Sequence, residues 1–222
     1  MNGGTVTIVQ MASTTYSGII SGIANLTMGS PSNGTLTLTG QSTFTGVAGT
    51  NFGYPTVSIG YGGISLGVNN ALPTNSLISS TSTSTILSLN SYNQQVSYLS
   101  STSWKPIINL GTGTLSFGDA NSRATTYFNF TGTGTLKYVG TGTEQLAYYN
   151  GSTYGSYSNV TGGTIEVASG TLVLHALGVT SNPNLVIDAG ATLNVTSDTT
   201  AYATLFGSLT GSGTYLYTGN YS

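Results

Sequence analysis

The chain has 222 residues, of which 4% are charged, and its formal net charge is −2. Ordinary soluble domains carry about 25% charged residues, so hydroxyl and amide side chains must hold this surface in water. Three basic residues exclude the positive surface that nucleic acids or anionic membranes require. No apolar run approaches the roughly 20 residues of a membrane-spanning helix. The absence of cysteine excludes disulfides and thiolate metal sites.

The composition also favours strands over helices, because Thr, Val, Tyr, Ile and Gly are common while strong helix formers are scarce. The 38% hydrophobic content and the 15 tyrosines argue for a packed core rather than a disordered chain. No secretory signal precedes the first predicted strand, residues 5–9, so we expect an exported chain to be a mature form or a fragment.

Short strands with a common pattern follow along the chain. A small residue precedes each of them, and apolar residues then alternate with mostly polar ones, which directs one set of side chains into a core. These segments are residues 34–38, 63–66, 113–117, 134–138, 163–167, 170–174, 191–195 and 214–217. Two segments break the pattern and are expected to be irregular: residues 97–106, with the single Trp, and residues 144–159. We predict one repeat array over residues 1–222.

The spacing between the strands predicts how they are arranged. Leucine or isoleucine recurs at regular steps along the series Leu36, Leu66, Leu87, Leu115, Leu136 and Ile165, and again from Leu172 to Leu193. The steps fall within the repeat of about 20 to 50 residues that is typical of solenoids. The alternative is an antiparallel sandwich, but Asn-Gly, the commonest tight hairpin turn, occurs only three times. We therefore predict an all-β, parallel β-helix of about 8 to 10 coils.

Several stretches resemble the autotransporter-associated β-strand repeats in passenger domains of bacterial surface proteins. They are residues 16–22, 34–46, 64–73, 87–96, 162–174, 189–195 and 209–214. The resemblance covers most of the chain and implies a right-handed parallel β-helix that lies outside a bacterial cell, often as part of an adhesin. It implies no common chemistry, because function on such scaffolds depends on local sites.

The few ionisable residues give weak support for catalysis. Glu144, Glu166 and Asp188 are evenly spaced along the sequence, at close to one predicted coil, and stacked carboxylates would suit the cleavage of polysaccharides. Their local contexts differ, so we expect three separate solvated charges and no enzymatic activity.

The remaining polar residues are expected to have structural roles, and the tyrosines of the second half are candidates for surface contacts. His175 is expected to face outward, and without other His or Cys residues it predicts no metal or cofactor. Asp119 and Arg123 are expected to fasten a turn. Aromatic side chains with a polar tip suit interfaces and sugar stacking. Two interpretations therefore stay open for the tyrosines of the second half: they are exposed for such contacts, or several of them fill coils or cover turns. These tyrosines are Tyr127, Tyr148, Tyr149, Tyr154, Tyr157, Tyr215, Tyr217 and Tyr221.

The ends of the predicted solenoid give the sharpest functional hypothesis. Terminal coils expose unpaired backbone groups unless polar caps cover them, and no helix or charged cap is visible in the sequence. The candidate assembly surface consists of Thr5, Val6, Thr7, Ile8, Val9, Thr214, Tyr215, Leu216 and Tyr217. We expect an extracellular or cell-surface structural protein whose partner is another copy of itself. The alternatives are an adhesin passenger fragment that contacts surface glycans or other cell-surface proteins, and a carbohydrate-binding or polysaccharide-degrading β-helix.

Overall fold

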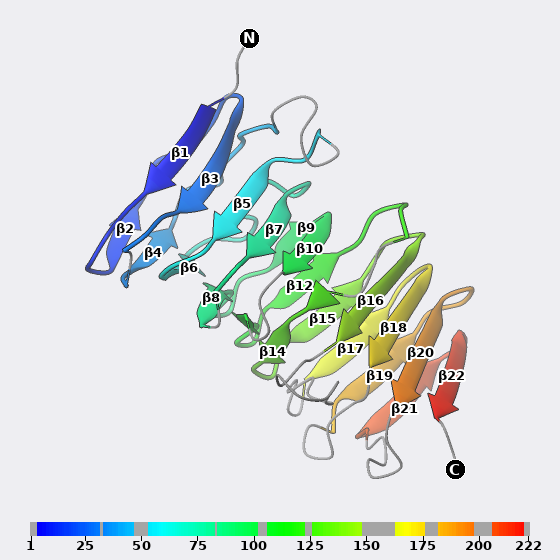
Figure 1. Cartoon of the computed structure of the whole chain (residues 1–222). Coiled ribbons are helices and arrows are strands. Elements are labelled where there is room, and N and C mark those ends of the chain that lie inside the picture. Colours follow the sequence, from blue (N-terminus) through cyan, green and yellow to red (C-terminus); the bar gives the residue numbers. More distant parts are fainter. Residues whose placement is uncertain are drawn as a thin grey trace.

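The structure of the chain is a computed structural model that describes residues 4–31, 33–46, 53–82, 84–101, 106–122, 126–147, 163–175, 182–197 and 206–219. In these ranges the chain forms β-strands and no α-helix. The strands lie in four sheets, and every pair of neighbouring strands is parallel (Figure 1).

The first and second sheets begin at the N-terminal end. In spatial order the first sheet consists of β1 (Gly4–Ile8), β3 (Ala24–Met28), β5 (Thr56–Ile59), β7 (Leu77–Ser80) and β10 (Tyr98–Ser101). The second consists of β2 (Thr14–Tyr16), β4 (Thr35–Leu38), β6 (Gly63–Leu66), β8 (Thr85–Ser88), β11 (Ile107–Asn109) and β14 (Asn129–Thr131).

The third and fourth sheets extend to the C-terminal end. The third consists of β9 (Gln94–Val96), β12 (Thr114–Phe117), β15 (Thr135–Tyr138), β17 (Thr164–Val167), β19 (Asn184–Ile187) and β21 (Ser208–Gly211). The fourth consists of β13 (Thr126–Tyr127), β16 (Thr143–Ala147), β18 (Thr171–His175), β20 (Thr192–Ser197) and β22 (Thr214–Gly219).

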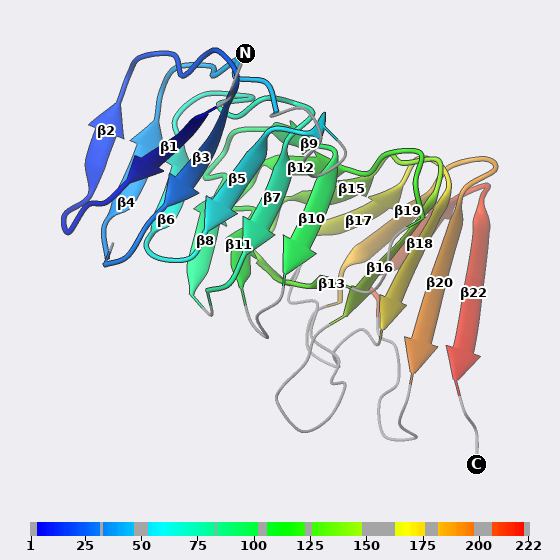
Figure 2. The same cartoon turned by 45° about the horizontal axis from the view of Figure 1, so that its top comes forward.

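The chain winds through these sheets as a β-solenoid of about eight turns. The turns differ in length, because the step from Gly4 to its partner Ala24 is much shorter than the step from Leu26 to its partner Val57. The fourth sheet continues the side of the solenoid that the first sheet begins (Figure 2), and the Ser101 amide donates a hydrogen bond to Thr126 Oγ1 at 3.1 Å across the junction. The described strands therefore form three sides of the solenoid, and each strand belongs to one rung of the stack.

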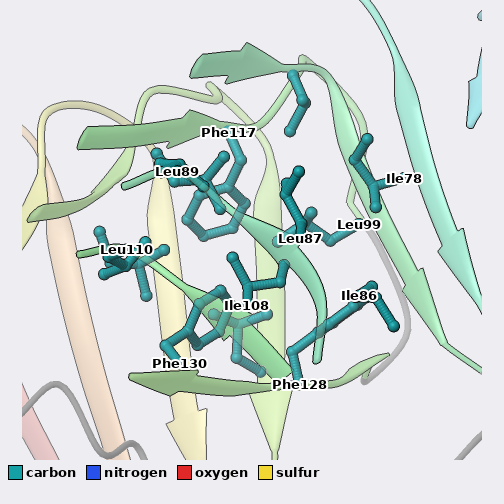
Figure 3. Close-up of a cluster of buried hydrophobic side chains, with 14 of the residues drawn as sticks. Ile78, Ile86, Leu87, Leu89, Leu99, Ile108, Leu110, Phe117, Phe128 and Phe130 are labelled. Atoms are coloured by element: carbon teal, nitrogen blue, oxygen red, sulfur yellow. The ribbon is translucent and has the colours of Figure 1, made fainter. Parts of the chain in front are cut away.

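Alternation within each strand separates the core from the surface. In β12 the side chains of Leu115 and Phe117 are fully buried, while Thr114 and Ser116 lie at the surface. Leu115 stacks on Leu136 of the next rung, and equivalent residues continue this column. Figure 3 shows how aliphatic and aromatic side chains from successive rungs fill the interior. Burying each such side chain stabilises the fold by about 1.5–3 kcal/mol.

Amide side chains tie neighbouring rungs together at one corner. Asn69 Oδ1 accepts a hydrogen bond from the backbone N–H of Asn93 at 2.8 Å, and Asn93 Oδ1 accepts one from the backbone N–H of Thr114 at 2.9 Å. Each bond crosses from one turn of the solenoid to the next. Neutral amide side chains thus connect successive rungs at this corner.

The same connections between the second and third sheets contain left-handed backbone at stacked positions. Asn90, Gly111 and Gly132 follow one another on successive rungs and have φ values of 57°, 56° and 101°. They are close-packed, because a Cβ atom at Gly111 would overlap the carbonyl oxygen of Asn90. Glycine at position 111 is therefore favoured by the conformation and required by the close stacking.

These observations confirm the predicted parallel β-solenoid and part of the predicted spacing. Leu115, Leu136 and Ile165 stack as predicted, as do Leu172 and Leu193. Two of the remaining steps join paired strands in a different register, since Leu66 pairs with Leu38 and Leu87 pairs with Ile64. The step from Leu87 to Leu115 joins strands of different sheets, since Leu87 pairs with Ile108 in the second sheet and Leu115 with Gln94 in the third.

Both segments predicted to be irregular contain regular strand. Residues 98–101 form β10, which pairs with β7, and residues 143–147 form β16, which pairs with β18. The polar sequences of these strands obscured the alternation that the pairing reveals. Residues 102–105 and 148–159 lie outside the described residues.

Candidate assembly surfaces at the two ends

The N-terminal end of the solenoid leaves core-facing side chains exposed. Val6 occupies the core-facing position that pairs with Leu26, and Tyr16 the one that pairs with Leu38. Leu26 and Leu38 are fully buried, whereas Val6 is 39% and Tyr16 is 43% exposed. Ile23, on the third side of the same rung, faces outward in register with the exposed Thr45 and is 41% exposed, so it extends the apolar surface at this end. We call Val6, Tyr16 and Ile23, with the half-buried Ile8 and Ile20, the N-terminal end surface.

The threonines of the first strand face away from the core, as the alternation along the strand predicts. Thr5 and Thr7 pair with Asn25 and Thr27 and point away from the core. Val9 lies beyond β1 and is exposed. Among the described residues β1 pairs with β3 alone and β2 with β4 alone, so both are edge strands.

The C-terminal end presents aromatic residues toward the end of the stack. Tyr215 and Tyr217 pair with the core residues Leu193 and Val195, and both are half-buried. Phe206 packs edge-on against Tyr215, with ring centroids 6.0 Å apart, and Leu209 is 43% exposed at a core-facing position. These four residues, Tyr215, Tyr217, Phe206 and Leu209, form the C-terminal end surface. Thr214 and Leu216 face outward, and β21 and β22 are the edge strands among the described residues.

Both end surfaces are electrically neutral. Residues 4–23 and 206–219 contain no Asp, Glu, Lys, Arg or His. Covering either surface would therefore remove apolar and hydroxyl groups from water without desolvating a charge, which is the costly step in many interfaces.

The environment of Tyr215 predicts a weakening of the C-terminal rung in alkali. Burial raises the pKa of Tyr215 above 10.0, and the neighbouring Tyr217 adds to this shift. A raised pKa means that the fold favours the neutral phenol, so its contribution is complete below pH 10 and is lost as the pH rises through the folded-state pKa. The urea midpoint of the wild type should fall between pH 8 and pH 11 by more than that of Tyr215→Phe. An equal fall in both proteins would contradict this assignment.

The three carboxylates with regular spacing do not form a ladder. Glu144 belongs to β16 in the fourth sheet, whereas Glu166 belongs to β17 in the third sheet and Asp188 follows β19. The prediction that Glu144 is solvated was wrong, because its side chain faces the core and is 3% exposed. Glu166 pairs with Lys137 of the neighbouring rung, with Nζ and Oε1 2.6 Å apart.

Two further polar predictions concern His175 and Asp119. His175 lies at the end of β18 with its side chain half-buried, and its Nδ1 lies 3.0 Å from Thr196 Oγ1 on the next rung. Asp119 fastens a turn by accepting hydrogen bonds from the backbone and side chain of Asn121, and it also accepts one from Tyr54 Oη at 2.7 Å. Arg123 lies outside the described residues. Within the described ranges no three His, Asp or Glu side chains lie close enough together to hold a metal ion.

The described tyrosines of the predicted set fit the alternative in which tyrosines fill coils or cover turns. Tyr127, Tyr215 and Tyr217 are half-buried, and Tyr148, Tyr149, Tyr154, Tyr157 and Tyr221 lie outside the described residues. Among the described residues the more exposed tyrosines are Tyr61 (51%) and Tyr16 (43%), and neither belongs to the predicted set. The glycines on both sides of Tyr61 in the sequence could have indicated that its ring is exposed.

Comparison of the chain with protein families, with curated proteins and with solved structures gives no match. In the part of the chain that the structure describes, no helix is long and apolar enough to cross a membrane.

Proposed function

We propose that the protein is a structural subunit that associates with itself by stacking the C-terminal end of one solenoid on the N-terminal end of the next. The observation that carries the proposal is the exposure of Val6 and Tyr16 at core-facing positions. Their counterparts one rung further along are covered by the neighbouring rungs. A second copy would cover the first rung in the same way.

The two edges match in direction and in pattern. Every strand pair in the solenoid is parallel, so β22 of one copy can pair with β1 of the next as one more rung. Core-facing residues alternate in both strands, and placing Val6 over Tyr215 brings Ile8 over Tyr217. The same step places the exposed Leu209 of β21 against residues 20–23 of the next copy.

The form of the assembly follows from the contact between unlike ends. A head-to-tail contact that does not close on itself produces an open filament. Because neither end surface carries charge, burial of apolar groups and backbone pairing would drive the association. Such an association depends weakly on monovalent salt and is strengthened by sulfate.

The experiment is sedimentation velocity across a wide concentration range, combined with electron microscopy of the concentrated sample. We expect the weight-average sedimentation coefficient to rise with concentration and unbranched rods of one solenoid's width to appear. Aligned rods should diffract at about 4.8 Å along the rod axis, because the strands lie across it. Dispersed monomers at every concentration would remove the proposal.

The proposal includes the setting in which such filaments would act. The resemblance to autotransporter-associated repeats and the charge-poor, hydroxyl-rich composition support an extracellular or cell-surface location. They also support the adhesin alternative, in which flanking repeats of a longer chain would cover the same end surfaces.

A further inference from the structure

A shallow groove crosses one edge of the solenoid, where the first side turns into the second. Its volume is about 340 Å³, within the range of about 300–1,000 Å³ typical of ligand sites. The corner between β5 and β6 and the corner between β7 and β8 form most of it, and these corners lie on adjacent rungs (Figure 2). It is lined by Asn33, Gly60, Tyr61, Gly62, Thr81, Ser82 and Ser84.

The aromatic ring of Tyr61 is the largest group in the groove. It is 51% exposed, whereas Tyr138 is fully buried in the core. Gly60 and Gly62 flank it, so no neighbouring side chain covers the ring faces from the same corner. Gly62 has a left-handed φ of 62°, and a Cβ atom at Gly60 would lie 3.2 Å from Thr81 Oγ1. The two glycines thus leave the ring open on both sides along the chain, and Gly60 lets a hydroxyl of the next rung approach the backbone beside it.

The remaining lining supplies neutral hydrogen-bonding groups. Ser82 accepts a hydrogen bond from the Ser84 amide at 3.1 Å, which leaves its hydroxyl hydrogen available to donate. Asn33, Thr81 and Ser84 add an amide and two hydroxyls. A hydroxyl both donates and accepts, and an amide side chain does both through different atoms.

The stretch of chain that builds the groove carries no charge. All Lys, Arg, Asp, Glu and His residues occur at position 105 or later, and the groove is built from residues 33–84. An anionic or cationic ligand would find no partner of opposite charge among the lining residues. The chemistry suits a neutral ligand that offers many hydroxyls and an apolar face for stacking on an aromatic ring.

We propose that the Tyr61 groove binds a neutral saccharide chain, with a sugar ring stacked on Tyr61 and its hydroxyls bonded to Asn33, Thr81, Ser82 and Ser84. The site is separate from the end surfaces, so it would remain open along a filament. A filament of such subunits would repeat the site once per copy, and many weak sites on one body bind a polymer with high avidity.

The test is isothermal titration calorimetry of the full chain with maltohexaose, cellohexaose, xylohexaose and mannohexaose, and with hexagalacturonate as the charged comparison. We expect at least one neutral oligosaccharide to bind and hexagalacturonate not to bind. Tyr61→Ala should weaken the binding by about tenfold or more, because it removes the stacking surface. Tyr61→Phe should change it by less than about threefold, because the ring remains.

A control variant separates this site from the rest of the surface. Asn75 is exposed and lines a different groove, formed by residues 41–45 and 70–75, so Asn75→Ala should leave the binding unchanged. Circular dichroism of each variant checks that the fold persists. The absence of binding to all four neutral oligosaccharides, or undiminished binding by folded Tyr61→Ala, would overturn the proposal.

Discussion

Replacing Gly111 by alanine is expected to destabilise the solenoid by about 2–5 kcal/mol, because two costs combine at this position. The φ of 56° is left-handed, which costs an L-residue roughly 1–2 kcal/mol. The new Cβ would overlap the Asn90 carbonyl oxygen, and relieving such overpacking costs about 1–3 kcal/mol. Urea unfolding followed by circular dichroism would measure the loss.

Gly190→Ala is the matched control, because it separates the two costs. Gly190 also has a left-handed φ, of 80°, but a Cβ atom there would have no neighbour within 4 Å. The free energy of unfolding of the control should therefore fall only by the cost of the left-handed conformation, about 1–2 kcal/mol. Equal losses at the two positions would show that the stack at residues 90, 111 and 132 is less tightly packed than the structure indicates.

Replacing Val6 by aspartate is expected to weaken self-association at least a hundredfold while leaving the subunit folded. In one subunit the Val6 side chain is already 39% exposed, so an aspartate there remains in water. In the proposed stack the same carboxylate would lie over Tyr215 without a cation, and an uncompensated buried charge costs about 3–5 kcal/mol. Since about 1.4 kcal/mol corresponds to a factor of ten, the loss is easily measured by sedimentation velocity.

Thr7→Asp provides the comparison on the same strand. Thr7 is the next residue of β1 and faces outward, in register with Thr27. Its aspartate would stay in solvent in the stack, so association should change far less than with Val6→Asp. If the Val6→Asp variant formed the same filaments as the wild type, the ends would not be the contact surfaces. Any association would then have to be lateral.

Much of the fold could be predicted from the sequence because two independent patterns are present: apolar residues alternate within strands, and the strands recur at a spacing close to one turn. Alternation within segments such as residues 134–138 indicates which side chains enter the core. The spacing between Leu115, Leu136 and Ile165 indicates which strands stack. The predicted register was wrong at Leu66 and Leu87 because a paired strand can offer two core-facing leucines or isoleucines. The sequence spacing does not say which of the two is the partner, and only the strand pairing in the structure does.

The candidate surfaces were predictable where they follow from the fold and were missed where they depend on local shape. The terminal strands must lie at the ends of any solenoid, so β1 and β22 could be named in advance. Tyr16 and Ile23 belong to less regular sides of the first rung, and the exposure of Tyr61 depends on how two corners stack. Glu144 was misjudged because a carboxylate at a core-facing strand position contradicts the usual preference for solvent.

The unequal turn lengths bear on how this architecture tolerates change. The step from β3 to β5 is considerably longer in sequence than the step from β1 to β3, yet both pairs remain in register. The additional residues lie between strands, and lengthening a surface connection adds little entropic cost. Since each rung contacts chiefly its neighbours, a peptide inserted at a corner would be displayed at a fixed height on the rod, and its influence would decay within a rung or two.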